Sequence, residues 1–148
     1  MSARYFDDFK IGDKFSTGST TITEAMILDF ARVYDPQPFH TDAAAAAKTI
    51  YGGLIASGFQ TLALGFRLVW DTGTIAASSM GSPGFDELRW LKPVKPGDAL
   101  SVEGQVVEQT PSRSKPDRGI VRIAYRYLNQ QGEIVLTFTA MHLLRRRG

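Results

Sequence analysis

Residues 57–70 read SGFQTLALGFRLVW, a pattern that indicates the central element of the fold. Its large apolar side chains recur at the spacing of an α-helix, with small or polar residues between them: Phe59, Leu62, Ala63, Phe66, Val69 and Trp70. A helix that is apolar on several faces suits a position where other elements pack around it. The polar residues between Leu54 and Trp70 make the segment too polar and too short for a membrane span. We therefore predict a buried core helix over residues 57–70.

Downstream of this helix, four segments alternate apolar and polar residues with the period of a β-strand. They are residues 85–91, 99–107, 120–127 and 134–144. Pro and Gly residues between 92 and 98, and the sequence Asn-Gln-Gln-Gly at 129–132, are typical of turns between antiparallel neighbours. We predict an α+β domain in which a strongly curved antiparallel sheet wraps around the long central helix. Residues 14–20 are a candidate edge strand.

Upstream, the apolar spacing of residues 22–34 predicts another helix, and Thr21 and Glu24 have the spacing of a capping box at its start. This helix delivers Asp35 at its C-terminal end. Asp42 can cap a short helix over residues 43–48.

The segment from Asp35 to His40, Asp-Pro-Gln-Pro-Phe-His, sets a carboxyl group and an imidazole five positions apart. Pro36 and Pro38 restrict the backbone away from helix, so we predict a stiff, extended elbow that can aim both side chains at one point. Histidine titrates near neutral pH, which makes Asp35 and His40 a candidate acid–base pair. The alternative interpretation of these residues alone is structural, with Asp35 capping backbone groups after the helix and His40 on a loop.

The composition is that of an ordinary globular protein, with 148 residues, 43% of them hydrophobic and 22% charged, and we expect one domain over residues 1–148. The chain has no cysteine, which excludes disulfides and thiolate chemistry. Its first fifteen residues lack the apolar core of a signal peptide, so we expect a cytoplasmic protein without a membrane segment. A net charge of +2 is too small to indicate nucleic-acid binding.

Positive charge is concentrated in two places: a loop with Arg113, Lys115 and Arg118, and the C-terminal residues 145–147. Either cluster could bind a phosphorylated ligand, although solvated charges that aid solubility have the same pattern.

His142 shares strand parity with the apolar residues of its segment, which indicates a core or interface histidine. Neither histidine has neighbours at metal-ligand spacing, so we predict no metal site.

Taken together, these motifs resemble the MaoC-like dehydratases, a family of hot-dog fold that includes the (R)-specific enoyl-CoA hydratases. Residues 35–42 resemble the family's Asp, Asn-Pro-x-His and following acidic residue. The sequence IASG at residues 55–58 resembles its Ile-Ala-His-Gly motif at the start of the core helix. The sequence LRWLKPV at 88–94, followed by Gly-Asp at 97–98, is similar to the family's next strand and turn. The resemblance covers nearly the whole chain.

The resemblance implies hydration of trans-2-enoyl-CoA to (R)-3-hydroxyacyl-CoA, or the reverse dehydration, without a metal or redox cofactor. Asp35 and His40 would hold the catalytic water between them and pass protons. The backbone N–H of Gly58 would stabilise the enolate oxygen with help from the helix dipole, unless this glycine serves only close helix packing. Ser57 would bond water or the Asp–His pair, or act only as the helix cap.

The resemblance also implies a partner and a ligand. Coenzyme A would be part of the substrate, an acyl-CoA thioester bound along a subunit interface. Hot-dog domains generally pair their sheets, so we expect a homodimer or a dimer of dimers. Arg113, Lys115 and Arg118 are candidate contacts for the CoA phosphates.

Two positions depart from the family pattern. Ser57 stands where many relatives have histidine, and Phe66, which we expect in the core, stands where some hydratases have a serine near the active centre. These departures leave two alternatives open. A non-catalytic acyl-CoA-binding hot-dog protein would not need Asp35 or His40. An acyl-CoA thioesterase would use a carboxylate in the core helix, and residues 54–70 contain none.

Overall fold

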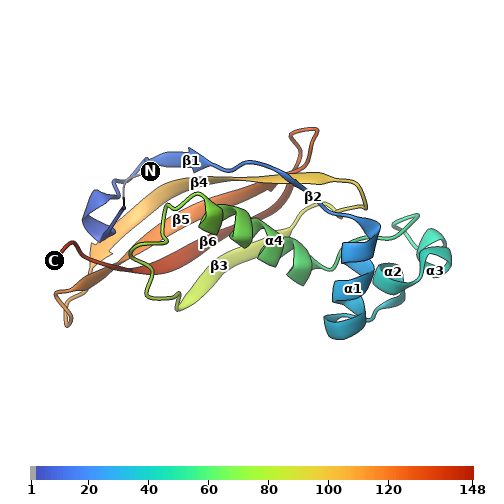
Figure 1. Ribbon diagram of the computed structural model, residues 1–148, viewed down its shortest axis with the longest axis horizontal. Coiled ribbons are helices and arrows are strands. Elements are labelled where there is room, and N and C mark those ends of the chain that lie inside the picture. Colours follow the sequence, from blue (N-terminus) through green and yellow to red (C-terminus); the bar gives the residue numbers. More distant parts are fainter. Residues whose placement is uncertain (1–2) are drawn as a thin grey trace.

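The structure, a computed structural model, describes residues 3–148. Figure 1 shows a long curved sheet with one helix, α4, along its face and a lobe of three helices at one end. The helices are η1 (Phe6–Asp8, a 3-10 turn), α1 (Glu24–Tyr34), α2 (Pro38–Thr41), α3 (Ala43–Ala47) and α4 (Gly58–Asp71). The strands are β1 (Lys14–Ser16), β2 (Thr20–Thr21), β3 (Gly84–Trp90), β4 (Ala99–Pro111), β5 (Arg118–Leu128) and β6 (Ile134–Arg145). Over the described residues, no helix is both long and apolar enough to cross a membrane.

The strands pair antiparallel in the order β1-β4-β5-β6-β3, and β2 pairs with the first residues of β4. The four predicted downstream strands are confirmed. Both β4 and β5 extend further toward the loop between them than their alternation indicated. The candidate edge strand at 14–20 is two short strands, β1 and β2. The α+β class and the antiparallel sheet are therefore confirmed.

The inner face of the sheet packs closely against α4, and one glycine makes this possible. Tyr127 on β5 is fully buried, and its hydroxyl donates to the Leu62 carbonyl at 2.8 Å. Its ring occupies the space of a side chain at position 65, since a Cβ on Gly65 would lie 2.1 Å from Tyr127 Cε2. Only glycine at this position lets the helix lie so close to the sheet.

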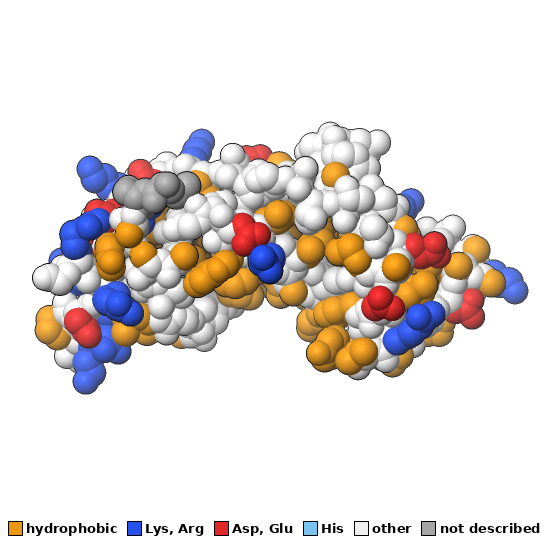
Figure 2. Space-filling view, in the orientation of Figure 1, with side chains coloured by type: hydrophobic (Ala, Val, Ile, Leu, Met, Phe, Trp, Pro, Cys, Tyr) orange, Lys and Arg blue, Asp and Glu red, His pale blue; other side chains and the backbone are white. Residues whose placement is uncertain are grey.

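On its other side α4 is not covered. Phe59, Phe66 and Trp70 have exposed fractions of 63%, 44% and 41%. The predictions of a helix wrapped on several faces, and of a core position for Phe66, are therefore wrong for a single chain, because one sheet covers one side of the helix. Phe85 and Trp90 on the edge strand β3 are exposed as well. We call these five side chains the exposed apolar face, and Figure 2 shows hydrophobic side chains gathered over α4 and around the helical lobe.

The helical lobe begins two residues later than predicted. Thr23, not Thr21, caps α1, and its Oγ1 accepts a hydrogen bond from the Met26 N–H at 3.1 Å. The residues before it pair with β4, which keeps them out of the helix. The predicted cap of α3 is confirmed, since the Ala45 N–H donates to the Asp42 carboxylate at 3.1 Å.

The elbow between these helices is only partly extended. Asp35 and Gln37 have non-helical backbone, as predicted, but Pro38 begins the helical turn α2. The prediction that the prolines exclude helix here is therefore wrong. At the first position of a helix proline is well tolerated, because its missing N–H would have no helical partner there. His40 consequently lies on α2 rather than on an extended segment.

Candidate active site

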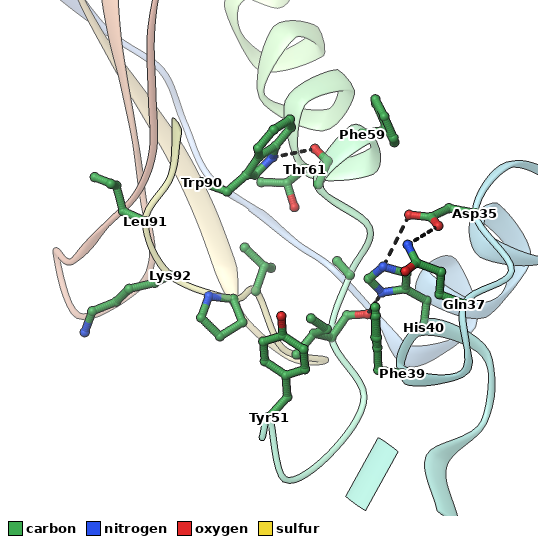
Figure 3. A pocket seen from close by; sticks show the side chains of 15 residues that line it. Asp35, Gln37, Phe39, His40, Tyr51, Phe59, Thr61, Trp90, Leu91 and Lys92 are labelled. Carbon is green, nitrogen blue, oxygen red and sulfur yellow. Dashed lines mark hydrogen bonds and ion pairs between the residues drawn. The ribbon is translucent and has the colours of Figure 1, made fainter. Parts of the chain in front are cut away.

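A pocket of about 480 Å³ lies where the helical lobe meets the start of α4 and the end of β3. Figure 3 shows Asp35 and His40 together on one side of it, with Trp90 beside the first turn of α4. The remaining wall is mostly apolar and comes from several stretches of chain: Phe39, Tyr51, Ile55, Ala56, Pro93 and Val94. An apolar pocket with a few convergent polar groups is the usual form of a binding or active site.

His40 is buried, and a backbone bond fixes its ring. Its Nδ1 lies 2.7 Å from the carbonyl oxygen of Ile55. A carbonyl oxygen can only accept, so Nδ1 carries a hydrogen and donates it. In the neutral imidazole Nε2 then has a free lone pair, and this nitrogen faces Asp35 Oδ2 at 3.3 Å. The Ile55 carbonyl therefore leaves Nε2 as the ring nitrogen that can accept a hydrogen bond.

Two neutral donors hold the Asp35 carboxylate. Gln37 Nε2 donates to Oδ1 at 2.7 Å, and Ser57 Oγ donates to Oδ2 at 2.8 Å. Burial opposes ionisation of Asp35 more than any one neighbour favours it. The bonds from Gln37 and Ser57 and the charge of His40 together outweigh burial and lower the pKa of Asp35 below its ordinary value. Asp35 is therefore an anion at neutral pH.

The pocket also contains the start of α4, where Gly58 is the first helical residue. The N–H groups of a first turn have no helical carbonyl before them, and the helix dipole makes that end partly positive. Trp90 packs directly on Gly58: its Nε1 donates to the Gly58 carbonyl at 3.0 Å, and a Cβ on Gly58 would lie 2.5 Å from that nitrogen. Glycine at this position thus has a packing reason, while its backbone lines the pocket.

The structure brings four of the predicted site residues together. Asp35 follows α1, His40 lies on α2, and Ser57 and Gly58 begin α4. Their contacts join the residue that follows α1 to α2 and to the start of α4. The local backbone that we expected to aim Asp35 and His40 at one point does so with a helical turn instead of an extended elbow.

The basic loop does not join this group within one chain. Arg113, Lys115 and Arg118 belong to the β4–β5 hairpin, which Figure 1 shows at the opposite end of the sheet from the helical lobe. None of the three lines the pocket, and Arg118 binds Asp117. The C-terminal arginines pair with acidic residues of η1: Arg146 with Asp7, and Arg147 with Asp8.

Three residues of the site were missed from the sequence. Gln37 binds Asp35 from two positions away, a spacing that a side chain of this length can reach. Tyr51 and Trp90 form pocket walls, and no pattern in the sequence shows that an aromatic residue of a loop or strand will line a pocket.

His142 is a core histidine, as predicted, and it lies apart from the pocket on β6. Within residues 3–148 no three His, Cys, Asp or Glu side chains gather as metal ligands would, and independence from metal stays a prediction.

The fold and the geometry of the pocket agree with one protein family. A curved antiparallel sheet around one long helix is the hot-dog fold, and here it carries a carboxylate and an imidazole at the start of that helix. The family model described as MaoC like domain matches residues 8–124. The chain therefore belongs to the MaoC-like dehydratase family.

Individual relatives agree with this assignment. A MaoC-like dehydratase from Rhodospirillum rubrum is 40% identical, with a TM-score of 0.90 and 99% of both chains covered. The R-hydratase PhaJ1 from Pseudomonas aeruginosa is 31% identical, with a TM-score of 0.73, covering 97% of this chain and 86% of that one. A mesaconyl-CoA hydratase from Cereibacter sphaeroides is 29% identical over 99% of this chain, which spans 42% of that longer protein. The relatives thus include hydratases as well as dehydratases.

Proposed function

We propose that this protein hydrates trans-2-enoyl-CoA thioesters to (R)-3-hydroxyacyl-CoA, or catalyses the reverse dehydration. The observation that carries the proposal is the Asp35–His40 pair, whose Oδ2 and Nε2 atoms lie 3.3 Å apart at the wall of an apolar pocket. With a neutral imidazole both atoms are acceptors, so one water between them can donate a hydrogen to each. The likeness to an R-hydratase and to a mesaconyl-CoA hydratase supports the same chemistry.

In this mechanism the water gives a proton to the pair as its oxygen bonds to Cβ of the enoyl group. The electrons of the double bond move toward Cα and the thioester oxygen, which gives an enolate. The first N–H groups of α4, that of Gly58 foremost, stabilise the enolate oxygen with help from the helix dipole. The proton held by the pair then passes to Cα. Water has been added across the double bond, and Asp35 and His40 return to their starting state.

We further propose that two copies of the chain pair through the exposed apolar face, with the acyl-CoA along their interface. Five aromatic side chains on α4 and β3 are a large apolar surface for one chain to leave in water. In addition, β3 is an edge strand of the sheet. Light scattering would show a dimer or a dimer of dimers, and Phe66→Glu should shift it toward monomer; a wild-type monomer would contradict the pairing.

Contact between the basic loop and the CoA phosphates stays a prediction. The loop lies at the opposite end of the sheet from the pocket, so a second copy of the chain is the simplest way to bring the two together. The cytoplasmic location and the absence of a cofactor other than the coenzyme A of the substrate also stay predictions.

The test is the loss of the enoyl thioester absorbance, measured with crotonyl-CoA and with a longer trans-2-enoyl-CoA. We expect turnover by the wild type and a decrease of about 10²–10⁴-fold in Asp35→Asn, which removes the charged acceptor at nearly constant size. Asp29→Asn is the matched control, because Asp29 is an exposed carboxylate on α1, and it should keep full activity.

Other outcomes would contradict the proposal. An unchanged rate in Asp35→Asn would remove this residue from the mechanism. A wild type that binds acyl-CoA without turnover would favour a non-catalytic binding protein. Release of free CoA thiol, with the double bond intact, would favour a thioesterase.

A further inference from the structure

Ser57 and Gln37 bind opposite oxygens of the same carboxylate. We propose that they are positioning residues that clamp Asp35 by one oxygen each and keep Oδ2 turned toward His40. The catalytic consequence of this clamp rests on the proposed function, whereas its geometry does not.

Ser57 forms the buried half of the clamp. Its hydroxyl accepts the Phe59 N–H at 3.3 Å, so its single hydrogen is free to point at Asp35 Oδ2, 2.8 Å away. The Ser57 carbonyl accepts the Thr61 N–H at 3.0 Å, which ties the residue to the first turn of α4. Ser57 is fully buried, so water does not compete for its hydroxyl. Ser57 therefore connects the positive end of α4 to the carboxylate.

Gln37 forms the exposed half. Its side chain donates to Asp35 Oδ1 at 2.7 Å, and its carbonyl accepts the His40 N–H at 2.9 Å. It thus contacts both members of the pair and fixes the start of α2. Because Gln37 is exposed, water can replace part of its bond to Asp35. We expect the loss of Gln37 to matter less than the loss of Ser57.

With both oxygens bound, the Asp35 carboxylate cannot rotate without breaking two hydrogen bonds. His40 is the titratable group in contact with it. The cationic side chain on the pocket wall, Lys92, points away in Figure 3 and binds Glu133. Within the described part of the chain, burial opposes the ionisation of Asp35, and His40 and two neutral donors favour it. Removing either donor should make its charged form less stable.

The experiment follows the Asp35 carboxyl carbon by NMR as pH is lowered, with its signal assigned by its loss in Asp35→Asn. We expect the pKa of Asp35 to rise by about one unit in Ser57→Ala and by less in Gln37→Met. Ser57→Thr keeps a hydroxyl and should restore the wild-type value. Ser114→Ala, an exposed serine in the β4–β5 loop, is the control and should change nothing.

Enoyl-CoA turnover gives the second readout. In Ser57→Ala the acidic limb of the kcat/KM profile should move in the same direction as the NMR titration, and kcat should fall by about tenfold with KM little changed. An unchanged pKa of Asp35 in folded Ser57→Ala would overturn the clamp, even if the wild type is an active hydratase. A raised pKa of Asp35 in Ser57→Ala, in a protein without turnover, would uphold the clamp and reject the proposed function. If Ser57→Ala does not fold, an unchanged pKa of Asp35 in Gln37→Met overturns the clamp.

Discussion

The two histidines of this chain are both buried, with exposed fractions of 5% for His40 and 3% for His142, yet their surroundings differ. His40 has a carbonyl on one nitrogen and a carboxylate beside the other, at the wall of a pocket. His142 lies on the sheet, where its Nε2 and the Tyr125 hydroxyl are 2.8 Å apart, and burial lowers the pKa of His142 to about 4. Burial also raises the pKa of Tyr125. Burial alone therefore does not distinguish the two histidines, whereas a charged partner at the wall of a pocket does.

The largest expected effect separates the two histidines directly. His40→Gln should lower kcat/KM by about 10²–10⁴-fold, because glutamine keeps hydrogen-bonding groups but cannot take up the proton. His142→Gln should keep kcat and instead lower the free energy of unfolding by about 1–3 kcal/mol, since it disturbs a buried bond to Tyr125. Steady-state kinetics and urea unfolding of both variants check this. Equal losses of activity would show that the two sites are not distinct.

The next effect is the pH dependence of stability. The unfolded chain protonates His142 near its ordinary pKa of 6.5, whereas the folded protein does so only near 4. Lowering the pH from 6.5 to 4 should therefore remove up to about 3 kcal/mol of stability, and none of this contribution is lost above 6.5. The lowered pKa of Asp35 acts in the same direction but at lower pH. Urea unfolding between pH 7 and pH 4 should show a shallower decline in His142→Gln; parallel curves would contradict the assignment.

A smaller effect compares a glycine at the pocket with one against the sheet. Gly65→Ala should lower the free energy of unfolding by about 1–3 kcal/mol and leave kcat unchanged, because the new Cβ meets the buried ring of Tyr127. Gly58→Ala should cost less stability, since Trp90 is on an exposed edge strand and can move, but it should lower kcat. Urea unfolding and turnover measured on both variants test this. Because alanine keeps the backbone N–H and adds only a methyl group, an unaffected kcat in Gly58→Ala would argue against a close approach of the thioester to this backbone.

The smallest effect concerns the basic loop. Charge reversal by Arg113→Glu or Lys115→Glu should raise KM for acyl-CoA a few-fold at low salt and less at high salt, because exposed charges are screened. The kcat value should not change, since the loop is remote from Asp35 and His40 in one chain. If neither charge reversal changes the affinity for acyl-CoA, the loop does not contact the CoA phosphates and its charges serve solubility only.

Local patterns in the sequence were sufficient for the long strands, because alternation such as that of residues 121–127 reports which face of a sheet is buried. The grouping of Asp35, His40, Ser57 and Gly58 also agrees with the family motifs. The conformation at Pro38 was not predictable in the same way, because proline both breaks a helix and begins one well.

Other features depend on relations between distant parts of the chain. The apolar faces of α4 indicated burial, but a sequence does not say whether a second covering layer belongs to the same molecule. The bond between Gln37 and Asp35 depends on side-chain orientation, which periodicity does not encode. The distance from the basic loop to the pocket depends on how long β4 and β5 are, and their pattern underestimated both.

The position of Trp90 has an optical consequence. It is one of two tryptophans in the chain, its indole forms part of the pocket wall, and its N–H binds the first residue of α4. The pocket therefore contains its own fluorophore. In Trp70→Phe all indole fluorescence would come from Trp90, and a bound ligand that displaces water from its ring would change the wavelength and intensity of the emission. Ligand binding could then be followed in real time with unlabelled molecules.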